Sequence, residues 1–292
     1  MAKLGVIGGS GVYHLPGVDH GAALTLSTPF GPPSSPLQQS RMGETDLVFI
    51  ARHGPGHTFS PTNLPYRANV YALKALGVTH VLSISAVGSL RQALPPRSLV
   101  VPDQIIDRTV SRDRTFFDRG VVAHVALADP FCPVFRDSLI DAARLAGHPV
   151  EPSGAYVCIE GPQFSTRAES HLYRSWGATV IGMTAMPEAR LAREAELCYA
   201  TLALVTDYDV WHDTEAAVTV ELVLGHLAAN VDVANHIIGT VASQVLPART
   251  CDCANALSQA IVTSPDHISA DQRSSLGIIA DRYLSAPSTG PA

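Results

Sequence analysis

Short apolar runs that end in glycine-rich or polar turns recur along this chain, and stretches with helical periodicity separate most of them. The strand-like runs cover residues 4–7, 47–51, 81–84, 99–106, 155–159, 179–183 and 197–205. The helix-like stretches cover residues 66–76, 135–146, 166–176, 187–195 and 219–245. Strands that alternate with helices form a mostly parallel sheet with helices packed on its faces. We therefore predict an α/β fold with a mostly parallel, mixed central sheet flanked by helices.

The length of the chain bounds the number of domains. Its 292 residues, 46% of them apolar, can bury one large α/β core or two small ones. No internal repeat and no clear boundary divides the series of strands and helices. We therefore predict one domain over residues 1–285. Residues 286–292 read APSTGPA, a composition typical of a disordered tail.

Charge and hydropathy exclude several classes of function. The formal net charge of −6 argues against a general nucleic-acid binder. No run of about 18 apolar residues occurs, so we expect no membrane span. The N-terminus enters a strand-like segment without a separate apolar region and cleavage site, which argues against a secretory signal. We therefore expect a cytoplasmic protein whose ligands are small molecules.

Five cysteines, an odd number in mostly apolar settings, fit a reducing compartment. Cys251 and Cys253 form a close pair that could make a strained disulfide, bind a soft metal or remain two thiols. Two ligands alone do not define a zinc site, and no CxxC motif or histidine at a diagnostic spacing lies nearby. We favour plain thiols with an occasional disulfide, and we predict no metal site.

Two carboxylates, Asp207 and Asp209, directly follow the apolar run at residues 197–205. Ligands of open α/β sheets bind at the carboxyl ends of strands. A pair of acids there could protonate a basic heterocycle or hydrogen-bond to it. The same residues could instead cap a helix and stand in its first turn. Both interpretations fit these residues taken alone.

Other strand ends carry groups suited to an anion and to an aromatic ligand. The turn GGSG at residues 8–11 could form a nest of inward N–H groups, although a plain hairpin turn has the same composition. The polar and aromatic residues that follow the other strands are Arg52, His53, Ser85, Ala86, Phe164, Met183 and Thr184. Together with the acids, they indicate a site for phosphate and a ligand that bears a nucleobase.

Seven segments in consistent order, from about residue 4 to about residue 262, resemble a known family. They are GVIGGSG at 5–11, TPFG at 28–31, ARHG at 51–54, SAVGSL at 85–90, IEGPQFSTRAE at 159–169, MTAMPE at 183–188 and TDYDVW at 206–211. These segments are similar to the signature segments of the 5′-methylthioadenosine phosphorylases, in the trimeric branch of the purine nucleoside phosphorylases. Long, ordered matches are far more specific than any single motif.

The resemblance implies a nucleoside phosphorylase-like fold, a homotrimer with sites at subunit interfaces, and no metal or organic cofactor. Phosphate, the co-substrate, would attack the anomeric carbon of methylthioadenosine and release adenine and 5-methylthioribose 1-phosphate. Such a reaction serves purine and methionine salvage. Asp207 would be the catalytic acid that addresses N7 of the purine, and Asp209 would help to fix the 6-amino group.

The resemblance also implies the remaining contacts. The predicted phosphate contacts are Ser10, Arg52, His53, Ser85 and Ala86. The predicted substrate contacts are Phe164, Ser165, Met183, Thr184, Asp209, Val220, Val223, Leu224 and His124. Among these, Phe164 would stack near the sugar and base, and Met183 would meet the ribose hydroxyls. His124 from a neighbouring subunit, with the stripe of Val220, Val223 and Leu224, would wall the 5′-methylthio pocket.

Alternative substrates and classes stay open at this point. Gly182 stands where adenine-specific members often carry Asn, and a Gly-Met-Thr run also occurs in relatives that prefer methylthioinosine. Those relatives lack the acid pair, which is intact here at Asp207 and Asp209. The chain could also act on other purine nucleosides or on 5′-halo-5′-deoxyadenosine. A non-catalytic nucleoside-binding protein is the alternative from a different class.

Overall fold

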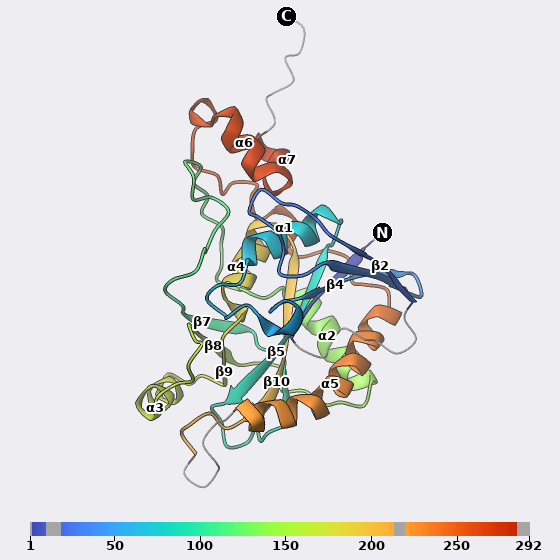
Figure 1. Ribbon diagram of the computed structural model, residues 1–292, viewed down its shortest axis with the longest axis vertical. Helices are drawn as coiled ribbons and strands as arrows, with labels where there is room; N and C mark the ends of the chain where they lie inside the picture. The colour runs from blue at the N-terminus through green and yellow to red at the C-terminus, as the bar shows by residue number, and fades with distance from the viewer. Residues whose placement is uncertain (1, 10–18, 213–219, 285–292) are drawn as a thin grey trace, which may run out of the picture.

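The computed structural model describes residues 2–9, 19–212 and 220–284. These residues form a ten-stranded mixed sheet with helices on both faces (Figure 1). The strands are β1 (Lys3–Gly8), β2 (Asp19–Leu24), β3 (Leu37–Met42), β4 (Thr45–Ala51), β5 (His80–Ser89), β6 (Leu99–Val100), β7 (Gln104–Arg108), β8 (Ala155–Ile159), β9 (Val180–Gly182) and β10 (Cys198–Asp207). The helices are α1 (Tyr66–Ala75), α2 (Pro133–Leu145), α3 (Arg167–Ser175), α4 (Ala185–Glu194), α5 (Val220–Ser243), α6 (Ala270–Leu276) and α7 (Asp281–Leu284), with short 3₁₀ turns η1 (Pro55–His57), η2 (Asp252–Asn255), η3 (Pro265–His267) and η4 (Gly277–Ile279).

Strands β5 and β10 lie side by side at the centre of the sheet and pair in parallel. Every residue of β10 is buried, and alternate residues point to opposite faces. Tyr199 and Ala203 join the core under α1 and α4, whereas Ala200 and Leu202 join the core under α2 and α5. Burial on both faces explains why this strand reads as a nearly continuous apolar run.

The order of the strands brings several carboxyl ends to one edge of the sheet. The main path runs β2-β3-β4-β1-β5-β9-β8-β7, and β10 pairs with β5 and β6 beside it. Strand β1 is parallel to β4 and β5, and β10 is parallel to β5, so these four strands end on the same side. The edge strands β2 and β3 and the β5–β9 pair are antiparallel. The predicted α/β fold with a mixed central sheet is confirmed.

The structure divides one predicted strand and adds elements that the sequence did not reveal. The run at residues 99–106 is two strands, β6 and β7, because Pro102 has no backbone N–H to continue a ladder. Strand β6 pairs with β10 and β7 with β8, so the break moves the chain from one part of the sheet to another. The hairpin of β2 and β3 was not predicted, because neither of its strands contains a long apolar run.

The segment after α5 returns to the body of the molecule. The chain from α6 to α7 stands beyond α1 in Figure 1 and packs Leu276 and Ile279 into the same core as Leu73. The predicted tail at residues 286–292 lies outside the described residues. Within residues 2–9, 19–212 and 220–284, no helix combines the length and the apolar character that a bilayer crossing needs.

Candidate active site

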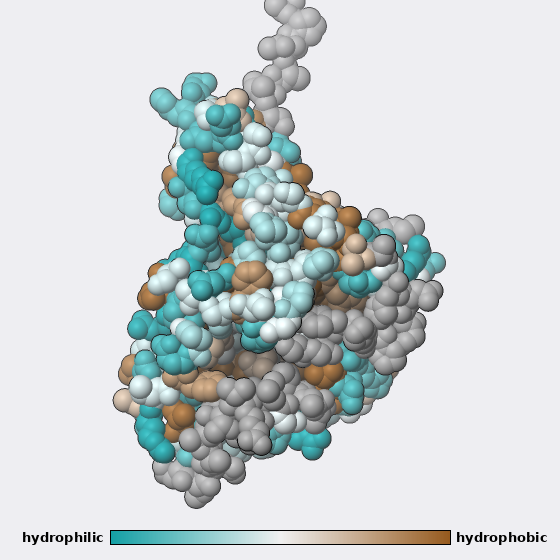
Figure 2. Space-filling view, viewed as in Figure 1, coloured by the Kyte–Doolittle hydropathy of each residue, from teal (hydrophilic) through white to brown (hydrophobic). Residues whose placement is uncertain are grey.

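A cavity of about 490 Å³ lies where β5, β9 and β10 meet the segments that follow β1, β4 and β8. Its walls include Arg52, Ser85, Phe164, Met183 and Asp207. In the space-filling view, apolar side chains lie in a recess on the face shown, over the ends of the central strands (Figure 2). The cavity therefore stands at the carboxyl edge of the parallel strands, where α/β proteins bind their ligands.

The two carboxylates at the end of β10 both border this cavity. The pairing of β10 with β5 shifts register between Val205 and Asp207, and Asp209 adopts a positive φ of 53°. The backbone N–H of Asp209 donates to Asp207 Oδ1 at 2.8 Å. Neither residue begins a helix, since the next described helix starts at Val220. The helix-cap interpretation of the pair is therefore wrong.

Burial dominates the electrostatics of the acid pair. It raises the pKa of Asp207 above the ordinary value, while hydrogen bonds from Thr206 and from the Asp209 backbone oppose the rise. Burial also raises the pKa of Asp209, and the neighbouring charge of Asp207 raises it further. Asp209 Oδ2 is buried and makes no hydrogen bond of ordinary geometry among the described residues, although the Ser170 hydroxyl lies near enough to lower the pKa of Asp209. An acceptor left unpaired in this way marks a place where a ligand can donate a hydrogen bond.

Thr206 connects Asp207 to the backbone of the neighbouring strand. Its hydroxyl lies 2.7 Å from Asp207 Oδ2 and 3.2 Å from the carbonyl oxygen of Val87. A hydroxyl has one hydrogen, so it can donate to only one of these oxygens at a time. Gly88 leaves room for the acids, because a Cβ there would lie 2.8 Å from Asp207 Oδ1.

On the opposite side of the cavity, Arg52 is held by an acid for which the sequence suggested no role. Its side chain is only 2% exposed, and its Nε donates to Glu188 Oε1 at 2.5 Å. Glu188, on α4, also accepts hydrogen bonds from Ser83 at 2.9 Å and from Tyr199 at 3.0 Å. The Arg52 charge is therefore balanced inside the protein. This acid stands within the segment MTAMPE, but nothing in the sequence pairs it with Arg52.

His53 is neutral near pH 7. Burial and the charge of Arg52 lower the pKa of His53 to about 4, and the ring of His57 stacks on it with centroids 4.1 Å apart. His53 Nδ1 lies 2.9 Å from the carbonyl oxygen of Phe59, which can only accept. The Nδ1 atom therefore carries the hydrogen, and Nε2 is left as an acceptor. Ser85 completes this side, with its Oγ 3.3 Å from Thr184 Oγ1 and 2.9 Å from the hydroxyl of Tyr156.

Gly182, the residue that departs from the adenine-specific pattern, has a packing reason. A Cβ at this position would lie 2.0 Å from the hydroxyl oxygen of Tyr156 and 3.1 Å from Val87 Cγ1. Tyr156 is fully buried, and its hydroxyl is the one that contacts Ser85. Glycine therefore gives Tyr156 the space from which it holds Ser85.

Arg112 is a second residue that the sequence did not single out, and it joins two walls of the cavity. Its Nη1 donates to the carbonyl oxygens of Met183 at 2.6 Å and Met186 at 2.5 Å. Its Nη2 donates to the carbonyl oxygens of Ile159 at 3.2 Å and Glu160 at 2.6 Å. Because Arg112 lies in the long loop before α2, its sequence neighbours give no signal of this role.

Most predicted site residues line one cavity. Those are Arg52, His53, Ser85, Ala86, Phe164, Ser165, Met183, Thr184, Asp207 and Asp209. Ser10 lies outside the described residues, and so do the side chains of Val220, Val223 and Leu224 on α5. His124 does not line the cavity of its own chain; its backbone N–H donates to Ala260 O at 2.8 Å. Its predicted role toward a neighbouring subunit stays a prediction.

Among the described residues, the cavity contains no group of three or more side chains placed to bind a metal ion. The one such group in this part of the chain is a set of four cysteines that includes Cys198. Cys198 begins β10, whereas Asp207 ends it, so the two sites lie at opposite ends of a ten-residue strand.

Comparisons with known proteins agree with this geometry. Residues 3–243 match the model of the phosphorylase superfamily. The S-methyl-5′-thioadenosine phosphorylase of Geobacter sulfurreducens is 47% identical and covers 96% of this chain and 99% of its own length. A crystal structure of methylthioadenosine phosphorylase from an antarctic soil metagenomic library is 46% identical, with a TM-score of 0.89 over 95% of this chain and 98% of that one. Methylthioadenosine phosphorylase from Schistosoma mansoni, in complex with adenine, is 36% identical, with a TM-score of 0.85 over 89% of this chain and 99% of that one. The chain therefore belongs to the phosphorylase superfamily and, within it, to the S-methyl-5′-thioadenosine phosphorylase family.

Proposed function

We propose that this protein is a pentosyltransferase that converts S-methyl-5′-thioadenosine and phosphate to adenine and 5-methylthioribose 1-phosphate. The observation that carries the proposal is the pair of buried acids at the cavity, Asp207 with a raised pKa and Asp209 with an unpaired oxygen. The relatives described above are phosphorylases of this nucleoside, and the Schistosoma enzyme binds adenine in its crystal structure.

Asp207 acts as the general acid. Adenine is a poor leaving group as an anion, so N7 needs a proton as the glycosidic bond breaks. A carboxyl group with a raised pKa retains a proton closer to neutral pH than an exposed one does. The sugar gains oxocarbenium character in such a transfer. Asp207 thus supplies the proton while the ribose becomes the electrophile.

Asp209 selects adenine. When Asp207 holds the proton of the pair, no neighbouring charge opposes ionisation of Asp209. The Asp209 carboxylate can then only accept hydrogen bonds, and the 6-amino group of adenine can donate one to Oδ2. Hypoxanthine would place a 6-oxo group against the same oxygen. Ser165 supports the preference, because its Oγ is also buried at the cavity without a partner among the described residues. A small hydroxyl leaves space for adenine where a longer acid would not.

Phosphate binds beside Arg52, His53 and Ser85. Glu188 balances the Arg52 charge, and His53 is neutral. Hydrogen bonds from N–H and O–H donors would therefore hold the phosphate, rather than an excess of positive charge. Nε2 of His53 can accept the hydrogen of a monohydrogen phosphate ion. Holding phosphate in line with the anomeric carbon supplies much of the acceleration, because orientation can contribute roughly 7–11 kcal/mol.

The remaining parts of the proposal rest on the family resemblance. We propose that Val220, Val223 and Leu224, with His124 of a neighbouring chain, enclose the methylthio group in a homotrimer. A thioether gains by burial among apolar side chains, whereas a 5′-hydroxyl there would lack a partner. Phosphate is the co-substrate, and no metal or organic cofactor takes part in the reaction. The enzyme works in the cytoplasm, in purine and methionine salvage.

The deciding experiment measures release of free base from a panel of nucleosides. Methylthioadenosine, methylthioinosine, adenosine and 5′-chloro-5′-deoxyadenosine are each tested with and without phosphate. We expect the highest kcat/KM for methylthioadenosine and no turnover without phosphate. Ser85→Ala removes a hydroxyl from the proposed phosphate site and leaves the Arg52–Glu188 pair intact. It should therefore raise the KM for phosphate more than the KM for the nucleoside. Equal base release in phosphate-free buffer would make the protein a hydrolase, and binding of adenine without turnover would make it a binding protein.

A further inference from the structure

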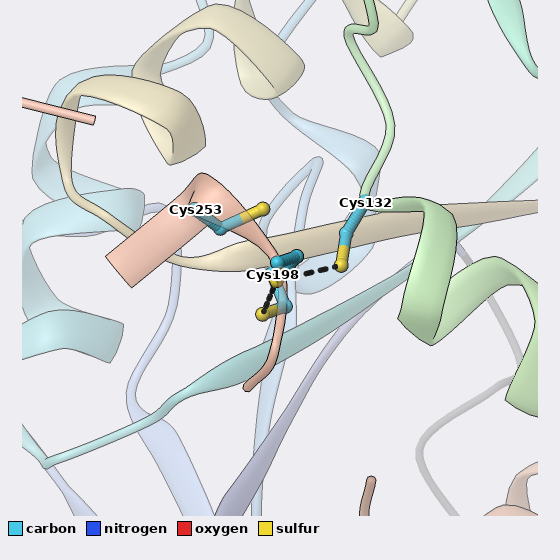
Figure 3. A group of neighbouring side chains, drawn as sticks. Cys132, Cys198 and Cys253 are labelled. Atoms are coloured by element: carbon cyan, nitrogen blue, oxygen red, sulfur yellow. Dashed lines mark hydrogen bonds between the residues drawn. The ribbon is translucent and has the colours of Figure 1, made fainter. Parts of the chain in front are cut away.

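Four of the five cysteines converge at the end of β10 that is remote from the acids. Figure 3 shows Cys132 at the start of α2, Cys198 on the central strand and Cys253 on the short turn η2, gathered at one place in the fold. Cys251, which precedes η2, lies 3.5 Å from Cys132 and 3.5 Å from Cys198, measured between Sγ atoms. All four sulfurs lie within 4.8 Å of one another.

The spacing of the sulfurs fits a tetrahedral metal site. A Zn²⁺ ion binds thiolate sulfur at about 2.3 Å, which separates the sulfurs of a regular tetrahedron by about 3.8 Å. The Sγ–Sγ distances of 3.5 Å from Cys251 to Cys132 and to Cys198, and the upper limit of 4.8 Å for the whole group, lie on either side of that value. Shifts of well under about 1 Å per sulfur, within the reach of a side-chain rotation, would therefore complete the ligand shell.

Positive and N–H groups surround the sulfurs as a charged cluster requires. Arg193 Nη1 donates to Cys253 Sγ at 3.5 Å, and Arg249 contacts Cys198. The backbone N–H of Phe135 donates to Cys132 Sγ at 3.4 Å. Four thiolates and one Zn²⁺ carry a net charge of −2, and two guanidinium groups balance it.

We propose that Cys132, Cys198, Cys251 and Cys253 together bind one structural Zn²⁺ ion. Binding replaces four S–H bonds by four Zn–S bonds and releases four protons to the solvent, with no change of oxidation state. Tetrahedral sulfur ligation favours zinc, and four protein ligands leave no open position for catalysis. The sequence alone could not indicate this site, because its ligands are far apart in the chain. Cys132 lies 119 residues before Cys251, and Cys198 lies 53 residues before it.

The site would fix the chain that follows α5 to the central sheet. Cys251 and Cys253 lie on that segment, Cys198 lies on β10, and Cys132 caps α2. Beyond η2 the same segment pairs with the long loop before α2 through a bridge between Ala123 and Ile261. Zinc therefore joins three elements that are distant in sequence, and it anchors the segment that supports the loop of His124.

Metal analysis of the unsubstituted chain tests the proposal. The protein is produced with a histidine-free tag in medium that contains zinc, passed over a chelating resin, and analysed by mass spectrometry of its elements. We expect one zinc per chain. Replacement by Co²⁺ should give the sulfur-to-cobalt charge-transfer bands and the intense visible bands of a tetrahedral tetrathiolate. A strong chelator should remove the metal and lower the Tm.

Serine variants provide the matched comparison. Cys198→Ser and Cys253→Ser should lose most of the zinc, whereas Cys158→Ser, a buried cysteine outside the cluster, should retain it. The measurements on the unsubstituted chain remain decisive even if the serine variants do not fold. Metal-free protein whose reduced thiols fail to bind Co²⁺ would overturn the proposal. So would stoichiometric iron, or a disulfide between two of the four cysteines in protein alkylated under anaerobic conditions.

Discussion

Glu188→Gln should destabilise the protein strongly, although it changes one carboxylate oxygen into an amide nitrogen. Glu188 accepts four hydrogen bonds: two from Arg52, one from Ser83 and one from Tyr199. Glutamine retains only one oxygen, so its amide must face at least one donor, and the buried Arg52 charge loses its partner. Breaking one side of a buried pair costs about 3–5 kcal/mol. We expect a Tm lower by on the order of 10 °C.

Glu194→Gln is the control on the same helix. Glu194 is also buried, and it accepts hydrogen bonds from Thr115 Oγ1 and from the Phe116 backbone N–H, each at 2.7 Å. Burial raises its pKa to about 7, so a neutral side chain is already well populated near neutral pH. Differential scanning fluorimetry at pH 7 should show a much smaller loss of Tm than for Glu188→Gln. Equal losses in the two variants would refute the assignment of Glu188 as the charge partner of Arg52.

Four further predictions concern the acids and the packing of the site. Asp207→Asn should lower kcat for methylthioadenosine by about 10²–10⁴-fold, because it removes the proton donor; near-native turnover would exclude this role. Asp209→Asn should bring the kcat/KM for methylthioadenosine and the kcat/KM for methylthioinosine closer together. The carboxylate of Asp209 lacks a donor when hypoxanthine is bound, a loss on the order of 2–4 kcal/mol, and the amide of Asn can donate to the 6-oxo group; an unchanged ratio of the two constants would place base selection elsewhere. Gly182→Ala should cost about 1–3 kcal/mol of stability through its contact with Tyr156, and denaturant unfolding with an unchanged midpoint would contradict the packing argument. Because the folded state raises the pKa of Glu194 to about 7, its contribution to stability is complete below about pH 4.5 and is lost as the pH rises to about 7. The Tm of Glu194→Gln relative to the parent should therefore rise between pH 5 and pH 8, and a constant difference would argue against this titration.

The sequence could predict which edge of the sheet carries the cavity, because each contribution is local. A strand that ends in a polar residue delivers that residue to the carboxyl edge, whatever the order of the strands, so Arg52, Ser85 and Asp207 were identifiable. The antiparallel edge of the sheet could not be predicted, because β2 and β3 lack long apolar runs. Pro102 was visible in the sequence, but only the pairing of β6 with β10 and of β7 with β8 shows that it divides the run.

Residues that act through a distant partner could not be predicted. Glu188 matters because α4 places it against Arg52, which is 136 residues away in the chain. Arg112 matters because it donates to the carbonyl oxygens of two walls, and backbone acceptors leave no pattern in a sequence. The steric reason for Gly182 could not be predicted either, because it depends on the hydroxyl of Tyr156, which would lie 2.0 Å from a Cβ at that position.

The position of Thr206 bears on how Asp207, the proposed general acid, would regain its proton after each turnover. When Asp207 is ionised, the hydroxyl hydrogen points to the carboxylate; when Asp207 is protonated at Oδ2, the acid donates to the hydroxyl, whose hydrogen turns to the Val87 carbonyl. One rotation about a C–O bond thus accommodates both forms, and no heavy atom has to move. Side-chain rotations of this kind take picoseconds to nanoseconds. The rate at which Asp207 is protonated again should therefore be set by delivery of a proton from solvent. In pre-steady-state measurements, this rate should depend on buffer concentration and should change in deuterium oxide.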